Sequence, residues 1–335
     1  MRDVAARAGV SVKTVSRVVN AEPHTRPEIV QRVRVAIDEL NWVPNGSART
    51  LRTGRTGVIG IGVPELRRPY LAALVEALVT ETDRRGMQAA VEPTHSDPDR
   101  LHTLLDARGR TFDGLVLVRP DGDFPIDGAL EERPVVVVHG ARELREVDRV
   151  DEDVVEAAAL VARHLAVMGR TRPALLGPDR ALVGAANPTG PSDVLRAALS
   201  AAGIDATAVP VVPLGSTWDR IAGARAAAEL IERGSDVDAL LCVNDEVALG
   251  ALMTLAAQGI DVPGRIAVIG YDDLDDGWFS TPSLTTIDPG PLRLARAALE
   301  LLADRLAGTA PAQARTVVSS VELVRRESTL GAQGR

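Results

Sequence analysis

The sequence has little cysteine, few aromatic residues and no long apolar run. Its 335 residues include one cysteine, Cys242, which excludes an internal disulfide framework and a cysteine-cluster metal site and fits a reducing compartment. Aromatic residues make up 2% of the chain and hydrophobic residues 45%, so any core must be aliphatic. No apolar run approaches the roughly 20 residues that cross a bilayer, and the N-terminus has no basic segment followed by an apolar one. We therefore expect a cytoplasmic chain of two or three domains that is neither membrane-spanning nor exported.

Charge is unevenly distributed along the chain. Residues 1–56 hold ten basic and five acidic side chains, a local charge of +5, whereas the whole chain carries −8. The remaining residues therefore carry −13. A small basic head on a large acidic body predicts that only the head approaches a polyanion. The alternative is chance clustering of cations on a solvated face.

The first 40 residues carry the signals of three short helices. Asp3 is placed to cap the first helix, and Ser11 to cap a second that runs to about Asn20. Thr25 and Glu28 have the spacing of a capping box for a third. Because a tight turn joins the first two helices, the pattern predicts a helix-turn-helix.

The first 51 residues also resemble part of a known protein family. The runs 3–20, 40–45 and 48–51 closely resemble the DNA-binding head and hinge of the lactose and galactose repressor (LacI) family. The resemblance implies that the second helix is a recognition helix in the major groove. Base-edge contacts would come from Val12, Lys13 and Arg17, and phosphate contacts from Thr14, Ser16, Asn20, His24 and Arg26. Each could instead be a solvated surface side chain.

Residues 45–56 resemble the hinge of the same family. Alone, this segment is too short and too rich in glycine and threonine to be a stable helix in water. The resemblance implies that it folds on the operator, where Asn45, Ala48 and Leu51 would contact DNA and Leu51 would enter a minor-groove step. A plain flexible linker is the alternative.

From Gly57 onward, short β-rich runs alternate with longer Ala- and Leu-rich amphipathic stretches, which is typical of parallel βαβ construction. Ligand-contacting residues are then expected at the carboxyl ends of the strands. The strands are expected at 58–63, 89–92, 114–118, 135–138, 173–176, 240–243 and 267–270.

Four later motifs resemble the effector domain of the same family: 242–251, 269–274, 281–287 and 323–329. The resemblance implies a fold similar to periplasmic sugar-binding proteins, with two α/β lobes, parallel sheets and three crossovers. The lobes would be about 57–155 with 286–316, and 156–282 with the C-terminal strand. We thus expect a helix-turn-helix domain at 1–44, a hinge at 45–56, and a two-lobed effector-binding and dimerisation domain at 57–335.

A small polar ligand between the lobes needs convergent carboxylate and amide groups and an apolar platform. The expected effector-binding residues are Arg68, Tyr70, Arg119, Asp153, Trp218, Asn244 and Asp272. For two residues a purely structural role is the alternative to ligand binding. Trp218 could be a core residue, and Asp245 could simply cap a helix. Since Arg68 and Arg119 would make the cleft cationic, the effector could be a sugar acid or sugar phosphate rather than a neutral sugar.

No set of residues indicates catalysis, a cofactor or a metal. Gly60 and Gly62 lack the third glycine of a dinucleotide loop, the histidines show no ligand spacing, and no serine lies in a nucleophile elbow. We expect a homodimeric, effector-controlled transcriptional regulator, most simply a repressor, that binds double-stranded operator DNA. The alternatives are an effector-independent DNA-binding protein and a solute-binding protein, although the latter would leave the basic head without a role.

Overall fold

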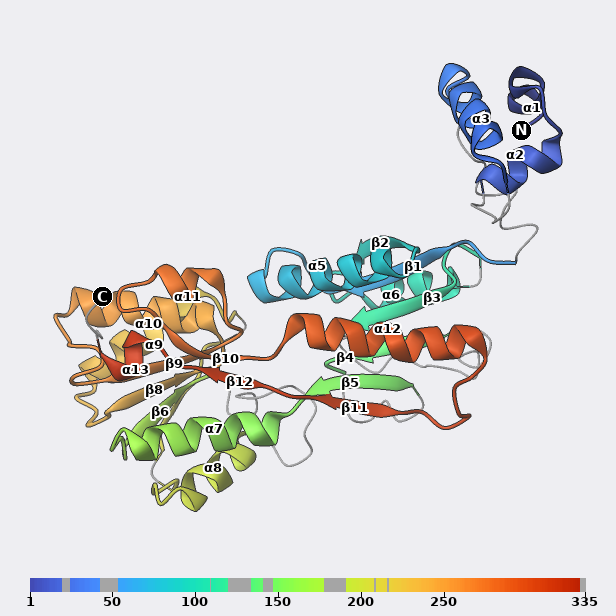
Figure 1. The fold of residues 1–335 in the computed structure, drawn as a ribbon. Helices are drawn as coiled ribbons and strands as arrows, with labels where there is room; N and C mark the ends of the chain where they lie inside the picture. Colours follow the sequence, from blue (N-terminus) through green and yellow to red (C-terminus); the bar gives the residue numbers. More distant parts are fainter. Residues whose placement is uncertain are drawn as a thin grey trace. The chain divides into compact units, whose positions relative to one another are not determined.

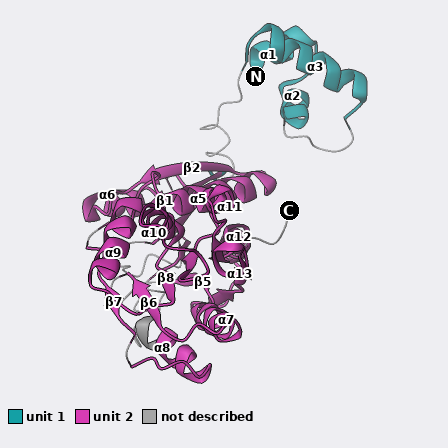
Figure 2. Cartoon of the chain, turned by 90° about the vertical axis from the view of Figure 1, so that its left-hand side faces the viewer, with its two compact units in different colours: residues 1–57 teal, residues 58–335 magenta. Residues whose placement is uncertain are grey.

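The computed structural model describes residues 1–19, 25–42, 54–108, 110–119, 134–140, 147–177, 191–207, 209–215 and 217–331. The chain divides into two compact units, residues 1–57 and residues 58–335 (Figure 2). The predicted boundary at residues 44 and 45 and most of the predicted hinge lie outside the described residues.

Unit 1 contains the three helices that the sequence predicts, α1 (Arg2–Ala8), α2 (Val12–Val19) and α3 (Pro27–Glu39). Gly9 ends α1 at a φ of 62°, a left-handed conformation that glycine adopts without strain. As predicted, the Ser11 hydroxyl caps α2 by accepting a hydrogen bond from the Thr14 amide at 3.1 Å. The core of the unit is small and aliphatic, and its buried members are Val4, Ala5, Ala8, Val15, Val33 and Ala36.

Two other predicted caps are wrong. Asp3 lies within the first turn of α1, after Met1, and makes no capping bond, although its carboxylate is near the positive end of the helix dipole. Helix α3 follows Arg26 and has no side-chain cap, so Thr25 and Glu28 do not form a capping box. Pro27 at its first position has no N–H, which leaves one donor fewer to satisfy.

Unit 2 contains two six-stranded sheets (Figure 1). The first has the order β11-β5-β4-β3-β1-β2 and the second β12-β10-β9-β8-β6-β7. Neighbouring strands are parallel except β10 and β12, which are antiparallel. The strands are β1 (Val58–Val63), β2 (Gln88–Pro93), β3 (Gly114–Val118), β4 (Val135–Val138), β5 (Asp148–Glu152), β6 (Pro173–Leu176), β7 (Val211–Val212), β8 (Ala239–Cys242), β9 (Ala267–Tyr271), β10 (Thr285–Asp288), β11 (Thr316–Ser319) and β12 (Glu322–Val324).

Helices cover both faces of each sheet. In lobe 1, the first sheet with its helices, α5 (Pro69–Arg84) and α12 (Pro291–Ala307) pack together against β1–β5, and α6 (Pro98–Asp106) packs near β1. In lobe 2, α7 (Val154–Val167) pairs with α8 (Pro191–Ala201), and α9 (Arg220–Glu232) with α10 (Asp245–Ala257). The short helices α11 (Asp275–Phe279) and α13 (Glu327–Leu330) complete lobe 2. The buried clusters are almost entirely aliphatic, as the scarcity of aromatic residues predicts.

The chain crosses between the lobes three times, after β5, after β10 and after β11. The sequence placed the second crossing too early, because β10 pairs with β9 and β12 and belongs to lobe 2. The chain enters lobe 1 only after Asp288, where Gly290 adopts a φ of 71° before α12. All seven predicted strands are present, with ends shifted by at most one residue.

Candidate functional site

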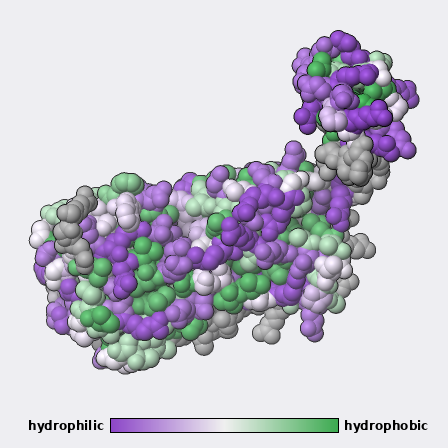
Figure 3. All heavy atoms as spheres, in the orientation of Figure 1, coloured by the Kyte–Doolittle hydropathy of each residue, from purple (hydrophilic) through white to green (hydrophobic). Residues whose placement is uncertain are grey.

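Helix α2 of unit 1 presents a basic face opposite its buried face. Val15 is fully buried, whereas Lys13 and Arg17, four residues apart, are exposed on the opposite side. Val12 is also exposed, at 43%. The visible surface of unit 1 is mostly hydrophilic (Figure 3). This arrangement leaves two cations and one apolar side chain accessible to a nucleic-acid groove.

The remaining residues of the predicted DNA interface fall into two groups. Ser16 and Thr14 are partly exposed, and the Thr14 hydroxyl lies 2.9 Å from that of Ser11, so it already takes part in the helix cap. Arg26 is exposed at the start of α3. The others lie outside the described residues: Asn20, His24, Asn45, Ala48 and Leu51.

In unit 2, the predicted effector residues gather at the carboxyl ends of strands from both lobes. From lobe 1, Tyr70 follows β1 and Arg119 follows β3. From lobe 2, Asn244 follows β8 and Asp272 follows β9. In α/β proteins a ligand binds at this edge of a parallel sheet, so the topology places these groups where a ligand would be held.

The Trp218 backbone carbonyl joins the two lobes. It accepts a hydrogen bond from Arg68 Nη1 at 2.8 Å and another from Asn244 Nδ2 at 3.0 Å. Arg68 also forms ion pairs with Glu65 at 3.1 Å and with Glu246 at 3.5 Å. Its charge is therefore largely balanced within the protein.

Arg119 lies over the Trp218 ring, and its charge acts on Asp272. The Arg119 guanidinium carbon lies 6.0 Å from the ring centroid. Burial raises the pKa of Asp272 well above its usual value, and the charge of Asp245 adds to this, whereas Arg119 opposes it. Among the described residues, none hydrogen-bonds or ion-pairs with the Asp272 carboxylate. Trp218 is half-buried and packs against the lobe 2 core, so it is partly a core residue and partly a wall of this site.

Asp245 fixes the turn that carries Asp272. Its fully buried carboxylate accepts hydrogen bonds from the Leu274 amide at 2.8 Å and the Thr286 hydroxyl at 2.6 Å. Burial raises the pKa of Asp245 to about 7. The interpretation of Asp245 as a helix cap is wrong, because Asn244 caps α10 through a 2.8 Å bond from the Val247 amide.

Asp153 lies apart from these contacts. Its carboxylate caps α7 by accepting a hydrogen bond from the Glu156 amide at 2.9 Å. Because Asp153 directly follows β5, it stands at the first crossing between the lobes. The structure thus brings together six of the seven predicted effector residues through contacts or shared strand edges, and gives Asp153 a helix-capping role at the crossing.

The comparisons with known proteins cover nearly the whole chain. Residues 1–45 match the family described as bacterial regulatory proteins, lacI family, and residues 162–329 match the periplasmic binding protein-like domain. The transcriptional regulator CelR of Thermobifida fusca is 33% identical over 334 residues, covering 96% of each chain. The chain belongs to the lacI family of bacterial regulatory proteins.

Solved structures of relatives agree with this assignment. A CelR–cellobiose complex is 30% identical, covers 97% of this chain and 98% of its own, and has a TM-score of 0.69. A Lac repressor dimer bound to operator and the anti-inducer ONPF is 25% identical, covers 98% of both chains, and has a TM-score of 0.76. As a lacI-family member, the chain is a DNA-binding transcriptional regulator, and its relatives are named as regulators rather than enzymes.

Three polar residues at strand ends near the candidate effector site of this lacI-family protein were not predicted from the sequence: His139, Glu152 and Tyr271. The Tyr70 hydroxyl lies 2.7 Å from Nε2 of His139, whose Nδ1 contacts the buried Glu152 carboxylate. The Tyr271 ring lines an apolar pocket with Val161 and other core residues of lobe 2. Their positions could have indicated them, because His139, Glu152 and Tyr271 lie at or just after the carboxyl end of a strand. However, β5 was not predicted, because four of its five residues are charged.

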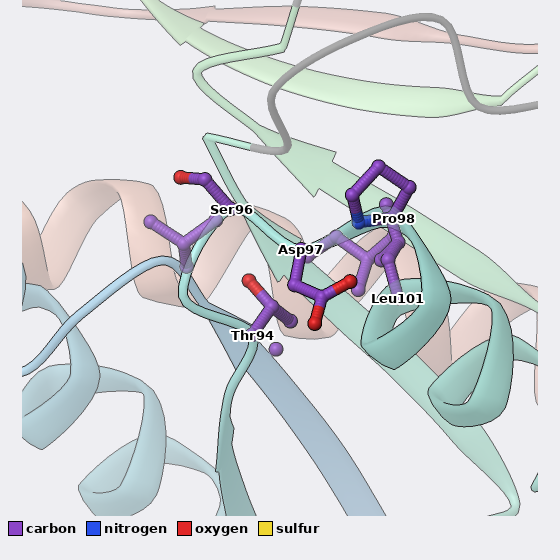
Figure 4. A pocket seen from close by; sticks show the side chains of 8 residues that line it. Thr94, Ser96, Asp97, Pro98 and Leu101 are labelled. Carbon is purple, nitrogen blue, oxygen red and sulfur yellow. The ribbon is translucent and has the colours of Figure 1, made fainter.

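A smaller pocket in lobe 1 of the lacI-family fold lies at the carboxyl ends of β1 and β2 (Figure 4). Thr94, Ser96 and Asp97 line it, and the Asp97 carboxylate caps α6 by accepting a hydrogen bond from the Asp99 amide at 2.9 Å. This carboxylate serves the helix, so the pocket is not assigned a ligand. Within the described residues, no three acidic, histidine or cysteine side chains are grouped as metal ligands, and no helix has the length and apolarity to cross a membrane.

Proposed function

We propose that this regulator senses a small, neutral, hydroxyl-rich molecule, a sugar or sugar derivative, held between the lobes of unit 2. The observation that carries the proposal is the Asp272 carboxylate at the end of β9, which has no hydrogen-bond or ion-pair partner among the described residues, together with Arg119, which influences its pKa and lies over the Trp218 ring. A carboxylate accepts hydrogen bonds from sugar hydroxyls, a guanidinium donates to them, and an aromatic ring packs against the apolar face of a sugar. The cellobiose bound to the related CelR supports the same ligand class.

A negatively charged effector, the alternative suggested by Arg68 and Arg119, has less support than a neutral one. Arg68 is balanced by Glu65 and Glu246, which leaves Arg119 beside the acidic Asp272. The site therefore has no excess positive charge to offset an anion's loss of hydration. This reasoning favours a neutral ligand over a sugar acid or sugar phosphate.

Calorimetry on the full-length protein tests the ligand class. The probes are cellobiose, other neutral mono- and disaccharides, glucuronate and glucose 6-phosphate. We expect at least one neutral saccharide to bind and to change operator affinity, with the anions binding more weakly. Tight binding of only the anions would restore the cationic-cleft interpretation, and binding of none would contradict a saccharide effector.

For the head, we propose a helix-turn-helix domain at 1–44, a hinge at 45–56 and an effector domain at 57–335. The exposed cationic face of α2 supports a role for Lys13 and Arg17 at base edges and for the neighbouring polar side chains at phosphates. The effector would change how the lobes meet, and so decide whether two hinges pair over the operator.

Arg17→Ala is expected to weaken operator binding by about 1–3 kcal/mol and to relax sequence preference at one base pair in each half-site, because a bidentate contact to a base would be lost. Fluorescence anisotropy with operator variants and random DNA measures both effects. Arg34→Ala, which removes the same charge from α3, is the matched control and should weaken binding to all sequences alike. Equal losses for Arg17→Ala on specific and random DNA would contradict a base contact.

The protein is further proposed to act as a homodimer in the cytoplasm, without enzymatic activity. The dimeric Lac repressor–operator complex supports the assembly, since two heads related by a twofold axis match two half-sites. The exposed aromatic side chains of Trp278 and Phe279, 61% and 81% accessible, give a second copy an apolar face to cover.

A further inference from the structure

Arg68 connects lobe 1 to lobe 2 within the candidate effector site. Its Nη1 donates a hydrogen bond to the Trp218 backbone carbonyl at 2.8 Å and lies 3.5 Å from a carboxylate oxygen of Glu246. Arg68 directly precedes α5 of lobe 1, whereas Trp218 lies just before α9 and Glu246 in the first turn of α10, both in lobe 2. The Arg68 and Glu246 side chains are 25% and 16% exposed, so salt and water screen this ion pair only in part.

On the lobe 2 side, the backbone around Trp218 is fixed by the close packing of α9 on α10. A Cβ on Gly223 of α9 would lie 2.1 Å from the Val247 carbonyl oxygen of α10, so only glycine allows the two helices to approach this closely. Asn244 spans the same contact, because its Oδ1 accepts from the Val247 amide at 2.8 Å and its Nδ2 donates to the Trp218 carbonyl at 3.0 Å. The carbonyl that Arg68 contacts therefore has a defined place in lobe 2.

On the lobe 1 side, Arg68 is fixed at its backbone and at its guanidinium. The residue before a proline favours an extended backbone, and Arg68, before Pro69, has φ −80° and ψ 121°. Its carbonyl accepts from the Ala72 amide at 2.9 Å in the first turn of α5. Its Nε donates to Glu65 at 3.1 Å, while Nη1 makes the contacts with lobe 2. Little side-chain freedom is left to lose when the lobes meet.

Lobe 1 also contacts the aromatic ring of Trp218. The guanidinium carbon of Arg119, which follows β3, lies over this ring at 6.0 Å from its centroid. The carbonyl and the ring of one lobe 2 residue are thus both contacted by arginines of lobe 1. A ligand that packs on the Trp218 ring meets a surface whose position depends on both lobes.

We infer that Arg68 is a positioning residue for the effector: by bonding the Trp218 carbonyl and pairing with Glu246 across the lobes, it fixes the aromatic platform and makes ligand affinity depend on lobe contact. The inference rests on the proposed saccharide effector and names a residue through which its binding is coupled to the arrangement of the lobes. In this role Arg68 acts through Trp218 and not through a contact with the ligand.

Calorimetry on the full-length protein, with cellobiose and the other neutral saccharides as probes, tests the effect on binding. Arg68→Met keeps an unbranched side chain but loses the charge and the donors. It is expected to weaken saccharide binding about tenfold, because the ligand must then hold the lobes together by itself. Arg67→Met is the matched control and should bind as the wild type does, since Arg67 is 80% exposed and pairs with Glu65 in its own loop. Equal affinities of Arg68→Met and the wild type would overturn the inference.

A double-mutant cycle with Glu246→Gln separates a contact between the lobes from a contact with the ligand. Glu246→Gln alone is expected to weaken binding about threefold, and the double variant should bind within about twofold of Arg68→Met, because Glu246 acts by holding Arg68. If the two losses multiply to about thirtyfold, Arg68 acts independently of its lobe 2 partner and the inference fails.

Fluorine-19 spectra of protein labelled with 5-fluorotryptophan test the positioning role without any ligand. The chain has three tryptophans, so the Trp218 resonance can be assigned by its loss in Trp218→Phe. It is expected to shift in Arg68→Met and to stay in place in Arg67→Met. A shift without saccharide binding would refute the saccharide proposal alone, whereas an unchanged Trp218 resonance in Arg68→Met would overturn this inference.

Discussion

Asp272→Asn is expected to weaken saccharide binding about a hundredfold, because hydrogen bonds to a charged acceptor each contribute about 1.5–3 kcal/mol and the amide keeps only one acceptor oxygen. Operator binding without ligand should be retained, since Asp272 lies in unit 2 and makes no hydrogen bond or ion pair to another described side chain. Calorimetry with the saccharides and anisotropy with the operator measure the two effects.

Asp272→Asn should not lower the thermal stability of the protein, although it weakens saccharide binding. Burial raises the pKa of Asp272, so ionising this carboxylate costs stability in the folded state, and its contribution to stability falls as the pH rises through the raised pKa. Removing the charge should therefore leave the melting temperature near pH 7 unchanged or higher, as is common for residues kept for binding.

The neighbouring Asp273→Asn provides the matched control. Asp273 forms an ion pair with Arg326 at 2.6 Å, so its replacement should lower stability and affect saccharide affinity less than Asp272→Asn does. If Asp272→Asn lowers the melting temperature as much as Asp273→Asn does, Asp272 has a structural role and the loss of binding is indirect.

Local patterns predicted most of the fold. Strands such as β1 and β4 are runs of β-branched and small apolar residues between turn residues, and their bounds were predicted to the residue. Strand β5 could not be found in this way, because Asp148, Arg149, Asp151 and Glu152 give it no apolar alternation. Its charges are tolerated only because residues distant in the sequence pair with them, as Arg305 and Arg315 do with Asp148.

The candidate site was predictable in part. The motifs around Asn244 and Asp272 carried the resemblance, and strand ends are where ligands bind in this fold class. The balance of charge around Arg68 was not predictable, because Glu246 lies far along the chain and meets Arg68 only across the lobes. His139 was weighed only as a metal ligand, so its contacts with Tyr70 and Glu152 became visible only in three dimensions.

Asp148→Ala is expected to destabilise unit 2 by about 3–5 kcal/mol, because it leaves two partly buried arginines without their shared anion. The Asp148 side chain is fully buried and joins three elements. It pairs with Arg305 of α12 at 2.8 Å and with Arg315, just before β11, at 2.8 Å, and it also accepts the Arg315 amide. These contacts hold the edge of the first sheet beside two of the three lobe crossings.

The control and the pH dependence separate this network from a general loss of charge. Asp304 pairs with Arg315 at 2.7 Å but is half exposed, so Asp304→Ala should cost less than about 1 kcal/mol. Hydrogen bonds from Arg305 and Arg315 hold the pKa of Asp148 below its usual value against burial. Its contribution is therefore complete above about pH 4–5 and is lost as the pH falls through the lowered pKa. Urea denaturation followed by circular dichroism should show the wild type losing its advantage over Asp148→Ala in acid. A difference between the two proteins that stays constant down to the acid limit would place the effect in packing rather than in the ion pairs.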